Sequence, residues 1–266
     1  MITAKDNRQL KNLRKLLAQG KERSAQKAFV VEGERLTREA PAELIEKIFV
    51  SESFDRQSSE VTDETGGFIG VRKKRTAGLP KDKIEVVTDE IFKGISDTVT
   101  PQGIMAIVKQ PEYSLDDMLD GKLYVMLDNI RDPGNMGTII RTAEAAGVSG
   151  VIISPGCTDI FSPKVIRSTM GSIFRVPFVT EEPSEAIKKF KAAGVNIYAA
   201  SLDGAEFYDK VMYGKKTAFV IGNEANGIRK EILDISDKKI KIPMGGKVES
   251  LNAAVSCAIL LYGYGK

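Results

Sequence analysis

The second half of the sequence alternates short apolar runs with helical patterns, and this alternation constrains the fold more than any other feature. Helical patterns separate the runs at 138–146 and 184–193, and a last one closes the chain at 251–262. Strands that are apolar at consecutive positions are buried on both faces, as in parallel sheets covered by helices. We therefore predict an α/β domain over 122–266 with a mostly parallel sheet. Its predicted strands lie at 123–127, 150–153, 195–200, 217–221 and 239–242.

The first 109 residues predict a smaller α/β domain with helices packed on a sheet. It opens with an amphipathic helix over 5–19, which Gly20 ends, and a second helix begins near Glu34. The stretch 51–80 is polar and glycine-rich, and its basic run 72–75 predicts a loop near RNA or, as the favoured interpretation, a solvated turn. Residues 110–121 predict a linker with one helical turn at 115–119. Strands are expected at 28–31, 48–50, 84–87 and 104–108.

Positive charge gathers at the N-terminus, although the formal net charge of the whole chain is only +3. Residues 1–30 hold eight lysines and arginines against Asp6 and Glu22. Such a basic end can bind a phosphate backbone, and it can equally be the solvated face of a helix. The charge alone favours neither interpretation. On the predicted helix, Leu10, Leu13 and Leu17 form the apolar face, and Arg8, Lys11 and Lys15 form a basic one.

Histidine is absent, which excludes the usual general base and every Ser–His or Cys–His dyad. The two cysteines, Cys157 and Cys257, stand far apart, which excludes a cysteine zinc site and a disulfide scaffold and fits a reducing cytosol. We therefore expect no metal. The start of the sequence has no apolar stretch of signal-peptide length, and no run is long enough for a membrane span. We expect a cytoplasmic protein without membrane contact.

Three segments carry the residue types of a functional site. The first, 127–141, joins a predicted strand to a predicted helix, where ligands bind in α/β proteins. Its Gly134 and Gly137 do not follow the G-x-G-x-x-G pattern, which disfavours a nicotinamide enzyme. Asn135 is placed to cap the helix. Arg141 follows among apolar residues, where a guanidinium is costly to bury unless it meets an anion or a carbonyl group.

The second and third segments follow later strands. In 219–228, Gly222 and Gly227 allow a tight turn in which a ligand can lie against backbone amides, and Glu224 stands between two asparagines. A plain strand-to-helix turn, with Glu224 near a helix N-terminus, explains the same residues. The third segment, 242–252, opens the last predicted helix, which Ser250 or Asn252 can cap. Each segment alone has a structural explanation, whereas the three in order indicate one site.

Taken together, the three segments resemble the motifs of the SpoU/TrmH family in the SPOUT methyltransferase superfamily. DPGNMGTIIRTAEAAGVSGVI is similar to the first family motif, FVIGNEANGI to the second, and IPMGGKVESLNAAVSCAILLY to the third. Their order, spacing and flanking strands agree with the family, and the match covers residue 122 to the C-terminus. The departures are mild, since Ala225 stands where glycine is frequent and Cys257 lies in the last helix. Neither changes a polar position.

The resemblance implies methylation of a ribose 2′-hydroxyl in RNA, with S-adenosyl-L-methionine (AdoMet) as the cofactor. It implies a C-terminal trefoil knot that binds AdoMet in a bent form, largely through backbone groups. It also implies a homodimer with composite sites. The residues that match the family's cofactor contacts are Gly222, Ile242, Met244 and Leu251. Those that match its polar site residues are Asn135, Arg141, Glu224, Ser250 and Asn252.

The implied reaction is an in-line displacement in which the ribose 2′-oxygen takes the methyl group. The family's proposed base matches Arg141. Arginine holds its protons tightly, so a charge-assisted hydrogen bond to the 2′-oxygen or to a neighbouring phosphate is chemically easier than proton abstraction. We expect Ser250 and Asn135 to orient Arg141, Glu224 to pair with a nearby donor, and Asn252 to hold the motif loops together.

The N-terminal region also resembles a family domain. Lys21, Arg23 and the segment 29–35 are similar to the opening of the ribosomal-protein-like substrate domain in members that act on large-subunit rRNA. We therefore expect residues 1–109 to bind RNA, and rRNA rather than tRNA to be the substrate. The alternatives are a tRNA 2′-O-methyltransferase, a base-methylating SPOUT enzyme and a non-catalytic RNA-binding protein on the same scaffold. The last would be expected to lack Arg141, Ser250 or Asn252.

Overall fold

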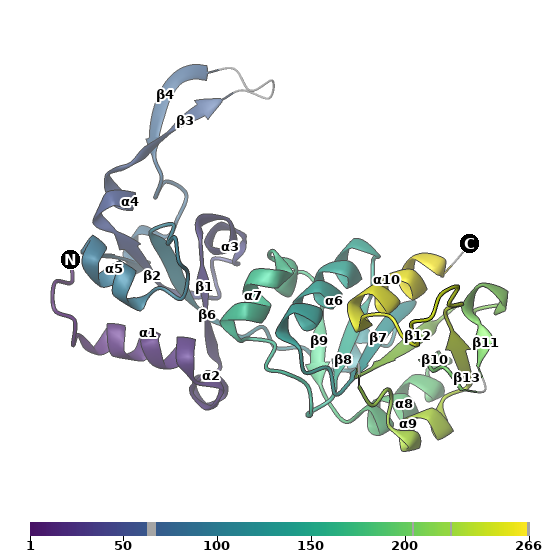
Figure 1. Cartoon of the computed structure of the whole chain (residues 1–266). Coiled ribbons are helices and arrows are strands. Elements are labelled where there is room, and N and C mark those ends of the chain that lie inside the picture. The colour runs from purple at the N-terminus through teal and green to yellow at the C-terminus, as the bar shows by residue number, and fades with distance from the viewer. Residues whose placement is uncertain (63–67, 204, 224, 265–266) are drawn as a thin grey trace. The chain divides into compact units, whose positions relative to one another are not determined.

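The computed structural model describes the backbone of residues 1–62, 68–203, 205–223 and 225–264 and, outside 58–62 and 68–73, their side chains. The chain forms two compact units (Figure 1). Unit 1 comprises Met1–Pro111 and Phe161–Pro163, and unit 2 comprises Glu112–Ile160 and Lys164–Lys266. No helix in the described part of the chain is long and apolar enough to cross a lipid bilayer.

Unit 1 is built on a four-stranded sheet in the order β1-β6-β2-β5. β6 pairs antiparallel with β1 and β2, and β2 pairs parallel with β5. All four strands lie where the apolar runs predict them. They are β1 (Ala28–Glu32), β2 (Ile45–Ser51), β5 (Ile84–Val87) and β6 (Ile104–Lys109). The helices of this unit are α1 (Arg8–Ala18), α2 (Gly20–Gln26), α3 (Glu34–Glu39), α4 (Glu52–Arg56) and α5 (Asp89–Ile95), with a 3₁₀ turn η1 (Lys81–Lys83).

Helix α1 separates an apolar face from a basic one. The side chain of Asn7 caps it by accepting a hydrogen bond from Gln9 N. Leu10 and Leu13 of the predicted apolar face are fully buried in the unit 1 core, whereas the predicted Leu17 is only partly buried and Leu16 takes the buried position instead. The side chains of Arg8, Lys11 and Lys15 are exposed. The prediction that Gly20 ends this helix is wrong, because Gln19 leaves the helical conformation first and Gly20 begins α2. The buried leucines are Leu10, Leu13 and Leu16.

A two-stranded hairpin occupies much of the stretch 51–80, and its second strand includes positions 72–74 of the basic run for which the sequence favours a solvated turn. β3 (Ser58–Thr62) and β4 (Phe68–Lys74) pair antiparallel in a sheet of their own. β3 has the sequence SSEVT, which contains no continuous apolar run. Without such a run, apolar patterning could not identify this strand.

Unit 2 contains a seven-stranded sheet in the order β11-β13-β10-β12-β7-β8-β9, in which every pairing is parallel. The predicted parallel α/β domain is thereby confirmed. The two edge strands, β9 and β11, are too short for the sequence pattern to indicate. The strands are β7 (Leu123–Asp128), β8 (Gly150–Ile153), β9 (Phe178–Thr180), β10 (Asn196–Ala200), β11 (Glu206–Phe207), β12 (Thr217–Gly222) and β13 (Lys238–Lys241).

Helices cover both faces of this sheet (Figure 1). Helices α8 (Pro183–Ala192) and α9 (Lys230–Ile235) lie on one face. Helices α6 (Pro133–Ala145), α7 (Pro163–Thr169) and α10 (Ala253–Gly263) lie on the other, where α10 packs against α6 and β12. Short 3₁₀ turns η2 (Asp116–Met118), η3 (Ser172–Phe174) and η4 (Tyr208–Lys210) complete the connections.

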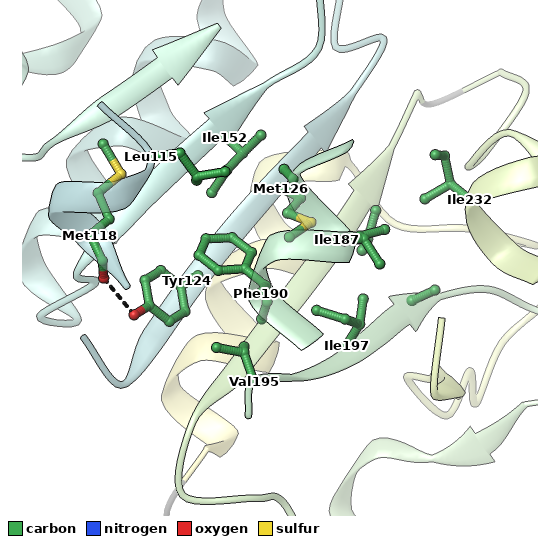
Figure 2. Packing of buried hydrophobic residues seen from close by; sticks show 14 of the residues in the cluster. Leu115, Met118, Tyr124, Met126, Ile152, Ile187, Phe190, Val195, Ile197 and Ile232 are labelled. Atoms are coloured by element: carbon green, nitrogen blue, oxygen red, sulfur yellow. Dashed lines mark hydrogen bonds between the residues drawn. The ribbon is translucent and has the colours of Figure 1, made fainter. Parts of the chain in front are cut away.

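The core beneath α8 joins the sheet to the segment that the sequence predicts as a linker (Figure 2). Phe190 of α8 is fully buried, and its ring centroid lies 4.5 Å from that of Tyr124 on β7. The Tyr124 hydroxyl donates a hydrogen bond of 2.6 Å to the Met118 carbonyl, which satisfies the polar end of a buried ring. Burial raises the pKa of Tyr124. Leu115 and Met118 belong to the same cluster, so this part of the predicted linker is packed into unit 2.

Replacing Phe190 with alanine should remove the centre of this cluster. Truncation of a fully buried phenylalanine costs about 3–5 kcal/mol of stability, because transfer free energy is lost and a cavity remains. Urea unfolding followed by circular dichroism would measure the change. Met212→Ala is the control, since Met212 is 93% exposed and its truncation should change stability by no more than about 0.5 kcal/mol. Equal stabilities of the two variants would contradict the assigned core.

Candidate active site

A cavity of about 470 Å³ lies at the carboxyl ends of β10, β12 and β13. In open parallel sheets, ligands bind outside the carboxyl ends of the strands. Gly222, Ile242, Met244 and Leu251, the four predicted cofactor contacts, all line this cavity, and so does Ser250. The described residues that line it lie at 200–203, 221–223, 225–228, 240–242 and 249–251, together with Leu233, Met244, Ala253, Ser256 and Leu260.

Gly222, the last residue of β12, allows the backbone of the second motif to fold closely over it. A β-carbon at this position would lie 2.3 Å from the Gly227 carbonyl carbon and 2.4 Å from the Ile228 nitrogen. Asn223 N donates to Gly227 O at 3.1 Å, and Gly227 N donates to Asn223 O at 2.8 Å. Gly227 adopts a φ of +68°. The two glycines of the motif thus permit a tight turn, which forms one wall of the cavity.

Asn252 connects the third motif to the first. Its Oδ1 accepts hydrogen bonds from Ala254 N at 2.9 Å and Val255 N at 3.3 Å, so it caps α10 as predicted. Its Nδ2 donates to Oδ1 of Asn135 at 2.8 Å. The single side chain therefore orients α10 and ties the loop before it to α6. Asn135 and Asn252 are brought together although 117 positions separate them in the sequence.

The prediction that Asn135 caps α6 is wrong, because Asp132 has that role. Asp132 Oδ1 accepts a hydrogen bond of 2.8 Å from Asn135 N, and Pro133 occupies the first helical turn, where proline is favoured. The helix therefore begins at Pro133 rather than at residue 138. Gly137 in its second turn serves packing, since a β-carbon there would lie 2.3 Å from Ser168 Cβ.

Arg141 lies on the exposed face of α6, together with Thr138 and Ala145. The expectation of a guanidinium among buried apolar neighbours is wrong, because those neighbours face the opposite side of the helix. Within the described residues the side chain of Arg141 forms no hydrogen bond or ion pair, so its orientation by Ser250 and Asn135 stays a prediction. Glu224, another predicted site residue, lies outside the described residues.

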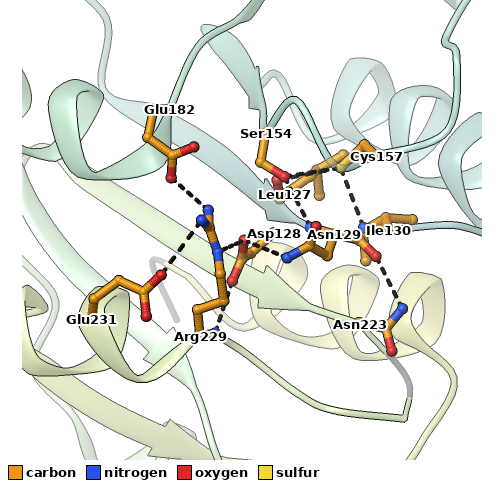
Figure 3. Close-up of polar contacts among 10 residues, drawn as sticks. All are labelled: Leu127, Asp128, Asn129, Ile130, Ser154, Cys157, Glu182, Asn223, Arg229 and Glu231. Atoms are coloured by element: carbon orange, nitrogen blue, oxygen red, sulfur yellow. Dashed lines mark hydrogen bonds and ion pairs between the residues drawn. The ribbon is translucent and has the colours of Figure 1, made fainter.

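An ion-pair network around the buried Asp128, which the sequence analysis did not identify, holds the end of the second motif to β7 (Figure 3). Asp128, the last residue of β7, is fully buried and accepts hydrogen bonds of 2.8 Å from both Nε and the backbone N of Arg229. Arg229 Nη2 also donates to Glu182 at 2.6 Å, and Nη1 lies 3.5 Å from Glu231. Burial opposes the charge of Arg229, but the hydrogen bonds to Glu182 and Asp128 outweigh it and raise its pKa. The sequence signal that could have indicated this network is Asp128 itself, a charged residue at the end of an apolar run.

A second set of hydrogen bonds extends this network across the first motif (Figure 3). Asn129 adopts a φ of +59°, and its carbonyl accepts a bond of 3.0 Å from Asn223 Nδ2. Ser154 Oγ accepts from Asn129 N at 3.0 Å, and Cys157 Sγ accepts from Ile130 N at 3.2 Å. Burial raises the pKa of Cys157 and keeps the thiol protonated. The starts of the first and second motifs are thus fixed to each other.

The chemistry of the cavity suits an organic ligand with apolar and polar parts. Ile221, Ile242, Leu251 and Met244 provide apolar surface beside the exposed backbone of the 223–227 turn. Apolar walls with a few convergent polar groups are typical of small-molecule sites. Within the described residues, no group of three or more Asp, Glu, Cys or His side chains is placed to hold a metal ion.

Comparison with known proteins agrees with these features. The model of the SpoU rRNA Methylase family matches residues 122–262, and that of the MRM3-like substrate binding domain matches residues 7–106. A 23S rRNA (guanosine(2553)-2'-O)-methyltransferase of Bacillus subtilis is 32% identical over 263 residues, which cover 98% of this chain and 97% of that protein. Two crystal structures of an rRNA methyltransferase from Sinorhizobium meliloti, one with AdoMet bound, are 30% and 31% identical, with TM-scores of 0.82 and 0.81. Both alignments cover 98% of this chain and 95% of theirs. This chain belongs to the SpoU rRNA methylase family.

Proposed function

We propose that this chain transfers a methyl group from AdoMet to a ribose 2′-hydroxyl of large-subunit rRNA. The observation that carries the proposal is the cavity at the sheet edge, where the second and third motifs meet and the Asn135–Asn252 bond joins them to the first. The Bacillus subtilis relative is named for this reaction on 23S rRNA, and a similar solved structure contains AdoMet. Several similar proteins are named as methyltransferases of rRNA alone, and two are named for tRNA and rRNA together.

The cavity residues fit AdoMet. A volume of about 470 Å³ falls within the usual range of small-molecule sites. We assign the apolar contacts to Ile242, Met244 and Leu251 and the backbone contacts to the turn after Gly222. AdoMet supplies a methyl group on a positively charged sulfonium. We further propose that the segment 242–252 forms the trefoil knot. After β13 the chain returns and packs α10 against α6 and β12, and this path supports the proposal.

Positioning of the ribose is the main catalytic task of this chain, because methyl transfer neutralises a charge and needs little covalent assistance. We assign Arg141 to hold the 2′-oxygen or its neighbouring phosphate by a charge-assisted hydrogen bond. Its exposed place on α6 supports a role toward a large ligand. Asn252 and Asn135 keep α6 and the third motif in register. Ser250 lines the cavity and is assigned, with Glu224, to the polar part of the site.

We propose a homodimer formed through α10. The sequence of this helix, AAVSCAILLYG, is apolar almost throughout, and such helices are usually buried on all sides. In the single chain Val255 and Tyr262 remain 47% and 55% exposed. Because α10 begins beside the cavity, a partner packed against it can complete the site. A cytoplasmic location is part of the proposal and is supported by two free thiols.

Residues 1–109 are assigned to RNA binding, 110–121 to the connection and 122–266 to catalysis. The exposed Arg8, Lys11 and Lys15 on α1 support the first assignment. Incubation of the purified protein with radiolabelled AdoMet and deproteinised 23S rRNA, 16S rRNA or tRNA tests the function. Label in the 23S rRNA ribose is expected. Label confined to tRNA would favour the tRNA alternative, and AdoMet binding without any transfer would favour a non-catalytic RNA-binding protein.

Replacing Gly222 with alanine should weaken AdoMet binding by about tenfold or more, equivalent to about 1.4 kcal/mol, because the new β-carbon displaces the 223–227 turn. Isothermal titration calorimetry would measure the dissociation constant. Gly94→Ala is the matched control, since a β-carbon there meets nothing within 4 Å. An unchanged dissociation constant in the Gly222 variant would remove this turn from the cofactor site.

Arg141→Ala should lower the rate of methyl transfer by orders of magnitude and leave AdoMet affinity nearly unchanged. Arg141→Lys should also fail, because a flexible point charge cannot replace a planar fork that holds two partners. Single-turnover kinetics and calorimetry on the same preparations separate the two effects. A lysine variant with most of the wild-type rate would show that a simple charge suffices. Loss of AdoMet binding in the alanine variant would make Arg141 a cofactor or structural residue.

The triple variant Arg8→Ala/Lys11→Ala/Lys15→Ala should weaken binding to deproteinised 23S rRNA by about tenfold or more and leave AdoMet affinity unchanged. Filter binding at several salt concentrations would measure the RNA dissociation constant. A triple alanine variant of Lys188, Lys210 and Lys215, exposed lysines of unit 2, removes the same charge and is the control. Equal RNA affinities of the two triple variants would mean that the basic face of α1 is only solvated.

A further inference from the structure

A second cavity, of about 390 Å³, shares residues 223 and 226–228 with the first. Asn223, Asn226, Gly227 and Ile228 line both cavities, so one turn of backbone forms a wall of each. The other walls of the second cavity come from residues just after β7 and around the start of α9. A ligand in one cavity is therefore separated from a ligand in the other by little more than this turn.

The second cavity is lined by cationic side chains. Arg131 and Lys230 are exposed, and within the described residues neither side chain forms a hydrogen bond or an ion pair. Arg229 also lines the cavity, but its charge is balanced by Asp128, Glu182 and Glu231. None of the described residues that line this cavity is an aspartate or a glutamate. Among the described residues, the cavity thus presents two positive charges without an acidic partner and suits an anion.

The backbone that carries the two cations is fixed on both sides. Ile130, next to Arg131, is fully buried; its N–H donates to Cys157 Sγ at 3.2 Å, and its carbonyl accepts from Thr158 N at 2.8 Å. Lys230 follows Arg229, which is held by the buried Asp128. Both cations are therefore presented by rigid segments. A site built on fixed backbone binds with a smaller loss of conformational entropy.

We propose that this cavity binds a phosphate of the RNA backbone next to the nucleotide to be methylated, with Arg131 and Lys230 as its ligands. The inference rests on the proposed function and names a binding subsite for its substrate. A strand whose ribose enters the cofactor cavity carries a phosphate on each side, and the shared turn places a cationic cavity beside that path. Asn226, exposed on the same turn, can hydrogen bond to a ribose hydroxyl or a base edge. Phosphate contacts of this kind fix register without reading sequence.

The test measures RNA binding by the full chain saturated with AdoMet. The probe is a fluorescein-labelled, single-stranded 20-nucleotide RNA, and its anisotropy is followed from 50 to 300 mM KCl. The double variant Arg131→Ala/Lys230→Ala should bind about tenfold more weakly at low salt. Its slope of log affinity against log salt should be smaller by about 1.4, because each lost contact to a single strand removes about 0.7. Its AdoMet dissociation constant should stay within about twofold of wild type.

Lys215→Ala is the matched control for Lys230→Ala. Lys215 is exposed and stands just before the amino end of β12, at the opposite edge of the sheet from the cavity. The Lys215→Ala variant should leave both the RNA affinity and the salt slope unchanged. Arg131→Lys should keep most of the wild-type slope, since a phosphate contact needs the charge more than the planar fork.

Several results would overturn the subsite. The first is that the double variant has the same RNA affinity and salt slope as Lys215→Ala. The second is that the wild-type chain does not bind the probe at 50 mM KCl. The third is that the AdoMet affinity of the double variant falls more than its RNA affinity. In the last case the two residues would support the turn rather than the RNA. The binding assay needs no methyl transfer. Absence of rRNA methylation together with the expected loss of slope would therefore refute the proposed reaction and leave the subsite standing.

Discussion

The functional end of unit 2 depends on one carboxylate without access to solvent. Asp128 is fully buried at the end of β7 and is satisfied by the side chain and the backbone of Arg229. Removing Arg229 would leave the charge of the buried Asp128 uncompensated, which is strongly destabilising. The turn after β12 must therefore keep the position that brings Arg229 to Asp128. Since Asn223 also bonds to the Asn129 carbonyl, the first and second motifs form one rigid body.

The parallel sheet explains why a single edge gathers residues from three distant motifs. Parallel strands all end on the same side, so the loops after β7, β10, β12 and β13 meet there. The chain order of the strands does not follow their order in the sheet, and the segment after β13 returns across it to begin α10. The bond between Asn135 and Asn252 closes this arrangement. The parallel strand topology thus brings the three motifs to the same side of the sheet, and a few side-chain hydrogen bonds hold them together.

Much of this fold was predictable from sequence, and the exceptions have physical causes. The strands β7, β8, β10 and β12 carry continuous apolar runs, so their burial on both faces could be predicted directly from the sequence. Strand β3, with the sequence SSEVT, carries no such pattern. The cap of α6 was misassigned because Asp132 and Asn135 are both good capping residues, and Pro133 decides between them. The Asp128–Arg229 pair joins residues 101 positions apart, a relation that no local pattern contains.

The distribution of charge around the site follows from the chemistry of its two ligands. AdoMet carries a positive sulfonium, so an uncompensated cation inside the cofactor cavity would repel it at short range. Lys241, which lines that cavity, lies with its ammonium 5.0 Å from the centroid of the Phe207 ring, where the π-system partly offsets its charge. Arg141, Arg131 and Lys230 are exposed instead, where a polyanion can reach them. Attraction to RNA is strongest when the protein's cations face solvent and displace the counterions of the RNA. Binding of a small cationic cofactor is instead favoured by apolar walls and backbone dipoles. The glycine-containing turn after β12 is thin and lies between the two cavities. One site can therefore combine apolar walls for the cofactor with exposed cations for RNA.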